Sequence, residues 1–352
     1  MYALPERGKF PDTDVCFMAK KKSQASWWVA VAILLIGMFS FLGKLQLGNV
    51  LPSIPTVSTG STSGEIPTSP TSLPPAASKD SIRIATFNIQ VFGVSKMEKP
   101  VVRERLAELV RQFDLVAIQE IRSIDQTVLP KFVDLINAKG ADFKYLIGDR
   151  LGRTVSKEQY AYVYRSSLIE PIQGSIYNIE DRQDRLHREP FVGSFRMRTK
   201  PGEGGEPFSF TLVNMHTDPD EAEYEVGQMA GVYNFVTTYR PEEDDVIILG
   251  DLNVDASKLT PLTNIPLLRS VAGTGPTNTR GTKQYDHIVV NHQNTLEFTG
   301  RAGVLDMASF LKISPDDALD LSDHQPVWAE FRTTEQRGPI QVASPFTEQT
   351  VR

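Results

Sequence analysis

The chain has 352 residues, enough for one large α/β domain of about 250 residues with additional terminal segments. Hydrophobic residues make up 40% and charged residues 23%, which are ordinary globular proportions and exclude a fibrous or wholly disordered protein. The formal net charge of -6 argues against a protein that coats polyanions, but arginines and bound cations can still offset this background at a local phosphate site.

An uncharged apolar run at 27–43 follows three lysines at 20–22. This pattern predicts a transmembrane anchor with residues 1–26 in the cytoplasm, because positively charged flanks stay on that side. The run is slightly short for a bilayer core of about 30 Å, so a cleaved secretory signal is the alternative. Residues 44–80 are rich in Pro, Ser, Thr and Gly and are predicted to be a flexible linker. We therefore expect the rest of the chain outside the cytoplasm, membrane-anchored or secreted.

Between 81 and 332 the sequence alternates strand-like and helix-like stretches, whereas 333–352 has the composition of a flexible tail. Several adjacent strands without helices between them imply mixed or antiparallel sheets. We expect one compact α/β domain with stacked sheets inside and helices outside. Strands are predicted at 82–87, 115–118, 160–164, 191–198, 208–215, 245–249, 285–290 and 326–331, and helices at 101–113, 128–138 and 221–239.

Polar residues that could bind metal or move protons collect where these strands end. Each alone has an ordinary explanation as a turn residue, a solvated strand end or a structural histidine. Together they combine the hard oxygen ligands that Mg²⁺ prefers with two histidines of near-neutral pKa. This combination predicts a metal-assisted acid–base site. Its members are Asn88, Glu120, His216, Asp251, Asn253, Asp323 and His324.

Eight short segments carry a resemblance to a known family. They are TFNIQVFG, IQEIR, SKEQYAYVYR, REPFVGSF, NMHTDP, GDLNVD, YDHIVV and SDHQPVW. Their order and approximate spacing resemble the deoxyribonuclease I branch of the endonuclease/exonuclease/phosphatase superfamily over residues 82–331. The resemblance implies a four-layer α/β sandwich with two packed mixed β-sheets flanked by helices. It also implies an endonuclease that hydrolyses DNA with little sequence preference.

By this resemblance, a divalent cation, Mg²⁺ or Mn²⁺, is held or oriented by Asn88, Glu120 and Asp323. Asp251 and Asn253 would position the attacking water or a second cation. The resemblance also implies structural Ca²⁺. Asp184 and Glu189 match one family site, whereas Thr277 and Thr279 match the other, with Gly275 where an aspartate is expected. Both family disulfides are missing from this chain.

The resemblance makes His216 and His324 the acid–base pair, with Glu158 and Asp286 as their respective carboxylate partners. A carboxylate that accepts the Nδ1 proton fixes the imidazole tautomer and raises its pKa, which leaves Nε2 free to face the reacting oxygen. Phosphodiester hydrolysis needs one proton removed from water and one given to the leaving oxygen. Two histidines can supply both transfers.

Arg122 and Arg188 match arginines that in the family contact DNA phosphates, and a guanidinium suits this task because it can donate twice to one phosphate. Gln90 and Ser156 replace the family's arginine and tyrosine in the minor groove, so a weaker grip on duplex DNA is expected. Two other functions fit parts of the pattern. One is a phosphatase or phosphodiesterase acting on lipid headgroups or small phosphate esters, and the other is a non-catalytic surface binding module.

Overall fold

The computed structural model describes residues 80–153, 156–198 and 205–336. The predicted membrane segment at 27–43 lies outside these ranges, as do nearly all of the linker and the tail. No helix in the part of the chain that is described has the length and apolar character needed to cross a bilayer.

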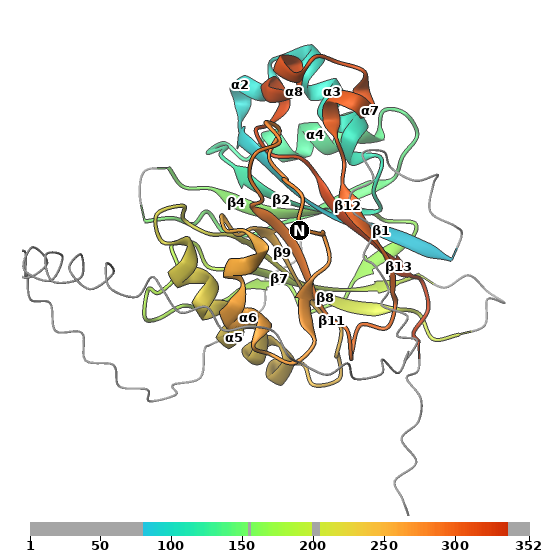
Figure 1. Cartoon of the computed structure of the whole chain (residues 1–352). Helices are drawn as coiled ribbons and strands as arrows, with labels where there is room; N and C mark the ends of the chain where they lie inside the picture. Colours follow the sequence, from blue (N-terminus) through green and yellow to red (C-terminus); the bar gives the residue numbers. More distant parts are fainter. Residues whose placement is uncertain (1–79, 154–155, 199–204, 337–352) are drawn as a thin grey trace, which may run out of the picture. The chain divides into compact units, whose positions relative to one another are not determined.

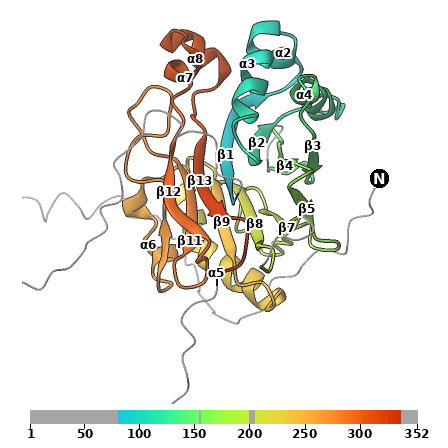
Figure 2. The same cartoon turned by 90° about the vertical axis from the view of Figure 1, so that its right-hand side faces the viewer.

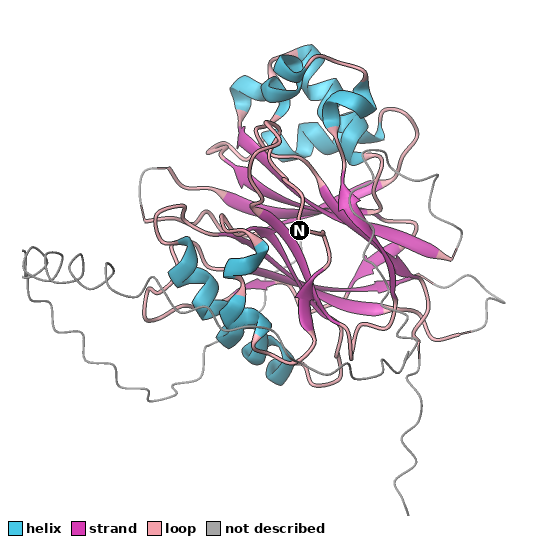
Figure 3. Cartoon of the chain, viewed as in Figure 1, coloured by secondary structure: helices cyan, strands magenta, loops and turns pink. Residues whose placement is uncertain are grey.

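Two mixed β-sheets pack against each other at the centre of the domain, and helices cover their outer faces (Figures 1 and 3). The first sheet has the order β12-β13-β1-β2-β4-β3. Its strands are β1 (Ser81–Phe92), β2 (Leu115–Ile121), β3 (Phe143–Ile147), β4 (Gln159–Arg165), β12 (Phe298–Val304) and β13 (Val327–Arg332).

The second sheet has the order β10-β11-β9-β8-β7-β5, and β6 pairs with β7. Its strands are β5 (Ile169–Pro171), β6 (Tyr177–Asn178), β7 (Phe191–Met197), β8 (Ser209–His216), β9 (Val246–Asp251), β10 (Leu268–Ser270) and β11 (Asp286–Asn291).

The helices divide between the two outer faces (Figure 2). One group lies on the first sheet: α2 (Val94–Met97), α3 (Pro100–Val110), α4 (Val128–Asn137), α7 (Met307–Leu311) and α8 (Pro315–Leu321). The other lies on the second sheet: α5 (Ala222–Tyr239), the 3-10 helix η1 (Ala256–Lys258) and α6 (Thr260–Thr263).

Three apolar clusters separate these four layers. The middle cluster fills the space between the sheets with aromatic side chains such as Tyr162, Phe195 and Phe210, all fully buried. Phe132 of α4 packs edge-on against Phe92 in the outer cluster of the first sheet, and Met229 of α5 lies in the outer cluster of the second sheet. The predicted four-layer sandwich is therefore confirmed.

Most predicted elements appear in the structure within a few residues of their expected bounds, but two strands are longer than predicted. β1 continues past Asn88 to Phe92, and β2 continues past Ile118 to Ile121. Both strands lose their regular pairing in these extensions. The predicted strand ends at 87 and 118 were therefore too early. Asn88 is the last residue of β1 before its pairing with β2 shifts register, and Glu120 is the penultimate residue of β2, inside the irregular pairing with β4.

Candidate active site

Three neighbouring strands of the second sheet bring polar residues into one row. His216 ends β8 and Asp251 ends β9, and the two residues are direct partners in the parallel β8–β9 ladder. Asp286 begins β11 and is paired with Asp251 on the other side. Gly250 allows the close approach of β8, because a Cβ there would lie 1.8 Å from the carbonyl oxygen of Met215. The register of these three strands therefore aligns His216, Asp251 and Asp286.

The first sheet supplies the facing residues. The Nδ2 of Asn88 donates to Glu120 Oε1 at 3.2 Å and to Asp251 Oδ2 at 2.9 Å, so one amide joins the two sheets. Glu120 and Val91 both have positive φ, 62° and 49°, which is costly for side chains with a Cβ and is typical of functional sites. The turned Val91 amide donates to Glu120 Oε2 at 2.9 Å. The strained backbone therefore orients the Glu120 carboxylate.

His216 forms one of the two predicted histidine–carboxylate pairs. Its Nδ1 lies 2.8 Å from Glu158 Oε1, and both side chains are buried. Arg188 holds the same carboxylate, with Nε 3.2 Å from Glu158 Oε1, and also donates to the main-chain oxygens of His216 and Thr217. The hydroxyl of Tyr160 accepts from the His216 amide at 3.0 Å. His216 is therefore held both through its imidazole ring and through its main chain.

His324 forms the second pair. Its Nδ1 lies 2.9 Å from Asp286 Oδ2. The Thr277 hydroxyl donates to the same oxygen at 2.7 Å and accepts from the amides of Tyr285 and Asp286. Thr277 therefore orients the carboxylate that orients the histidine.

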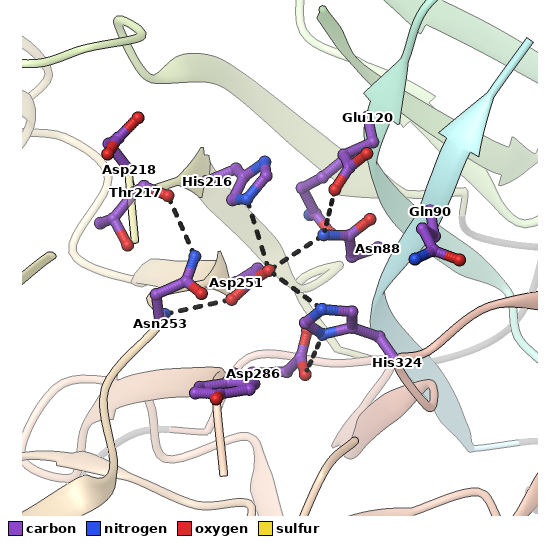
Figure 4. Close-up of polar contacts among 12 residues, drawn as sticks. Asn88, Gln90, Glu120, His216, Thr217, Asp218, Asp251, Asn253, Asp286 and His324 are labelled. Carbon is purple, nitrogen blue, oxygen red and sulfur yellow. Dashed lines mark hydrogen bonds and ion pairs between the residues drawn. The ribbon is translucent and has the colours of Figure 1, made fainter. Parts of the chain in front are cut away.

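The two pairs converge on Asp251 (Figure 4). Its Oδ2 lies 3.5 Å from His216 Nε2 and 3.4 Å from His324 Nε2. Its Oδ1 accepts from the Asn253 amide at 3.1 Å, and Asn253 Nδ2 donates to the Thr217 main-chain oxygen. Residues from two sheets thus surround one carboxylate, with both reactive imidazole nitrogens facing the same point.

Carboxylates control the protonation of both histidines. Burial lowers the pKa of His216, but Glu158 and Asp251 raise it more, and the net pKa lies above the ordinary value. Burial likewise opposes protonation of His324, while Asp286 and Asp251 raise its pKa well above the ordinary range. The carboxylates therefore make both imidazoles more basic than a free histidine side chain, which suits proton transfer to and from their Nε2 atoms.

We expect Asp286→Asn to move the limb of the pH–rate profile that reports His324 to lower pH, by about one unit. The sign follows because Asp286 raises the pKa of His324, so its removal makes the imidazole less basic. Profiles of kcat/KM against pH for the wild type and the variant measure the shift. Glu158→Gln is the matched variant for His216, and unchanged limbs in both variants would contradict the two pairings.

The oxygen atoms around Glu120 fit a hard divalent cation. Asn88 Oδ1 is buried and has no hydrogen-bond partner, which leaves a lone pair available for a ligand bond. Burial raises the pKa of Glu120, but the combined effect of His216, the Val91 amide and Arg122 is larger and lowers it. The net pKa lies below the ordinary value, and the carboxylate stays charged.

Two other predicted ligands are Asp251, which accepts from Asn88, and Asp323. Asp323 Oδ1 is buried without a hydrogen-bond partner, 3.9 Å from His324 Nε2. Asp251, Asp286 and His324 offer atoms within 4.8 Å of one another. Since Asp286 and His324 are hydrogen-bonded to each other, we interpret them as an acid–base pair. The metal-ligand prediction therefore rests on Asn88, Glu120, Asp251 and Asp323.

The two predicted phosphate contacts differ in exposure. The Arg122 side chain is 30% exposed and lies 2.9 Å from Glu120 Oε2, so it borders the site. Arg188 is buried and engaged with Glu158, which gives it a role in positioning that carboxylate. Ser156 accepts from Arg122 at 2.7 Å. The phosphate contacts stay predictions.

Two positioning residues were missed by sequence reasoning. Ser322 donates to the Asn88 main-chain oxygen at 2.7 Å and accepts from the Gln90 and His324 amides, which ties the first sheet to the loop that carries His324. Lys96 donates to the main-chain oxygens of Gln90 and Leu321 across the same junction. Ser322 precedes the predicted Asp-His pair directly, so its position was the available signal.

Comparisons with known proteins agree with this geometry. The model of the Endonuclease/Exonuclease/phosphatase family matches residues 85–324. The chain belongs to this family. It is 31% identical to deoxyribonuclease-1-like 1 of Rattus norvegicus over 74% of this chain and 84% of the relative, and 30% identical to deoxyribonuclease-1 of Gallus gallus over 70% and 90%. These similarities place this family member in the deoxyribonuclease I branch.

A solved family structure shares the fold. It is an endonuclease/exonuclease/phosphatase family protein from Bacteroides thetaiotaomicron, with a TM-score of 0.50, 16% identity, and coverage of 73% of this chain and 98% of that one.

Proposed function

We propose that this family member is a divalent-metal-dependent endonuclease that hydrolyses DNA phosphodiester bonds with little sequence preference. The observation that carries the proposal is the convergence of His216 Nε2 and His324 Nε2 on Asp251, beside the oxygens of Asn88 and Glu120. The similarity to deoxyribonucleases supports DNA as the substrate.

The two imidazoles perform the proton transfers. One Nε2 accepts a proton from the attacking water, and the other donates a proton to the leaving oxygen of the cleaved bond. Asp251 lies within 3.5 Å of both nitrogens and can orient the water between them. Glu158 and Asp286 stabilise each imidazolium as it forms, so neither step leaves a buried positive charge without a partner.

The divalent cation, Mg²⁺ or Mn²⁺, would lie next to the two histidines, held by Asn88, Glu120 and Asp323. The chemistry that such a cation would supply there is neutralisation of the charge on the phosphoryl oxygens. Arg122 is placed to add a positive charge next to the same phosphate, since it borders Glu120 and remains partly exposed. Such contacts grip the DNA backbone and read no bases, which agrees with low sequence preference.

The substrate class is tested by comparing two kinds of phosphate ester. Release of acid-soluble nucleotides from duplex DNA is measured beside hydrolysis of sphingomyelin and inositol phosphates, each with Mg²⁺, Mn²⁺ or EDTA. We expect metal-dependent nucleotide release and negligible turnover of the small esters. Preferential hydrolysis of the esters would show the alternative specificity, and no hydrolysis of either class would favour a binding module.

We propose that residues 27–43 anchor the protein in a membrane with the catalytic domain outside the cytoplasm, on the linker at 44–80. The apolar run, its preceding lysines and the Pro/Ser/Thr-rich stretch support this topology. Protease added to intact spheroplasts is expected to remove the catalytic domain while a cytosolic marker survives. Full protection of the domain, with none of it in the membrane fraction, would contradict the topology.

A further inference from the structure

A second group of carboxylates lies at the opposite end of β9 from the active site. Asp245 directly precedes β9, Glu297 directly precedes β12, and Glu335 follows β13. One carboxylate oxygen from each lies within 4.8 Å of the others. Asp251 ends the same strand six residues after Asp245, so the two ends are on the order of 20 Å apart. The cluster is therefore separate from the catalytic residues.

The cluster is buried and its oxygens are incompletely satisfied. Asp245 and Glu297 are each only 1% exposed, and Asp245 Oδ1 and Glu297 Oε2 have no hydrogen-bond partner. Thr295 is 2% exposed, and its hydroxyl has no partner of ordinary hydrogen-bond geometry. That hydroxyl faces Asp245 and favours its charged form. Polar atoms are rarely left in this state, because a buried donor or acceptor without a partner destabilises the folded protein.

Few groups compensate the negative charge. The Ser209 amide donates to Glu335 Oε1 at 2.8 Å, and the Gln336 amide donates to Glu297 Oε1. Among residues 80–153, 156–198 and 205–336, no lysine or arginine forms an ion pair with Asp245, Glu297 or Glu335. A bound cation would supply the positive charge that these buried carboxylates lack.

We propose that Asp245, Glu297, Glu335 and the Thr295 hydroxyl form a Ca²⁺ site. All four donors are oxygens, and no histidine or cysteine joins them, so the set selects a hard cation over zinc or copper. Ca²⁺ accepts several protein oxygens in flexible geometry, whereas Mg²⁺ usually keeps several waters. Glu243 and Asp244, which also have oxygens within 4.8 Å of Asp245, add negative charge beside the site.

The site would act as a cross-link. Its ligands come from the start of β9, the loop between β11 and β12, and the segment after β13, which are distant in the sequence. A cation bound only in the folded state stabilises that state in proportion to its concentration. The chain has a single cysteine and forms no internal disulfide, so this Ca²⁺ would supply a cross-link that a disulfide provides in other exported domains.

Thermal melting of the full chain tests the site. With Ca²⁺ at about 100 times its dissociation constant, the wild type is expected to melt about 5–10 °C higher than in EDTA. Glu297→Gln is expected to lose this increase. Its melting temperature in EDTA should equal or exceed that of the wild type, because the amide removes one buried charge from the cluster. Glu335→Gln, at a less buried position, is the second variant if Glu297→Gln fails to fold.

Two control variants separate this site from others. Glu242 is an exposed residue three positions before Asp245, and its carboxylate pairs with Arg240. The Glu242→Gln variant should keep the full increase in melting temperature with Ca²⁺. Glu120→Gln removes a predicted ligand of the active site and should keep it too. The site would be disproved if Ca²⁺ stabilised both cluster variants as much as the wild type, or if Glu120→Gln alone abolished the effect. A wild-type melting temperature that responds to pH but not to Ca²⁺ would show a proton-bound cluster instead.

Discussion

His216→Ala and His324→Ala are each expected to lower DNA hydrolysis by about two to four orders of magnitude, the range for losing general acid–base help. Each alanine removes one of the two Nε2 atoms that face Asp251, so either the water keeps its proton or the leaving oxygen receives none. The folded state should survive, because neither histidine belongs to one of the three apolar clusters. Initial rates on duplex DNA measure the effect, and circular dichroism checks the fold.

His292→Ala is the matched control. His292 is exposed and directly follows β11, at the end opposite Asp286, so the same substitution there removes an imidazole without touching the site. It should retain the wild-type rate. A folded His216→Ala or His324→Ala protein with near wild-type activity would remove that histidine from the mechanism.

Glu120→Gln is expected to abolish metal-dependent hydrolysis. The amide keeps the side-chain volume and can still accept from the Val91 amide, but it loses the negative charge that would hold a divalent cation beside Asn88. The melting temperature of the metal-free protein should change little, because the loss of the ion pair with Arg122 is offset by the removal of a buried negative charge. Hydrolysis is measured across a titration with Mg²⁺.

Glu108→Gln provides the comparison for this variant. Glu108 lies exposed on α3, so its loss changes the net charge by the same amount away from the site. Activity of Glu120→Gln at ordinary Mg²⁺ concentrations would mean that the cation binds elsewhere.

Much of the fold and the histidine pairs could be predicted from the sequence. Buried strands such as β2 and β9 are short apolar runs with clear ends, so the local sequence pattern is enough to predict them as strands. His216 and Asp251 end such strands, and register then brings them together. The carboxylate partners Glu158 and Asp286 came from the family resemblance, and the structure places both within hydrogen-bond distance of their histidines.

Other features depend on geometry that the sequence pattern does not carry. Glu120 reaches the site through a positive φ inside a strand, and the residues next to it in the sequence do not predict that conformation. Strands such as β12 were missed because glycine and exposed polar residues interrupt their alternation. The Asp245 cluster combines residues that are up to 90 positions apart in the sequence, so only folding reveals that they meet.

Nicking of supercoiled plasmid shows whether this chain cuts DNA at the site built around Asp251. The full chain is incubated with plasmid in Mg²⁺, Ca²⁺, Mn²⁺ or EDTA, and the open-circular and linear forms are followed over time. We predict nicked circles first and linear DNA later, with Mg²⁺ or Mn²⁺ but not with EDTA, and neither product from the double variant His216→Ala/His324→Ala. Cutting that persists in EDTA or in the double variant, or intact plasmid with every cation, would contradict it.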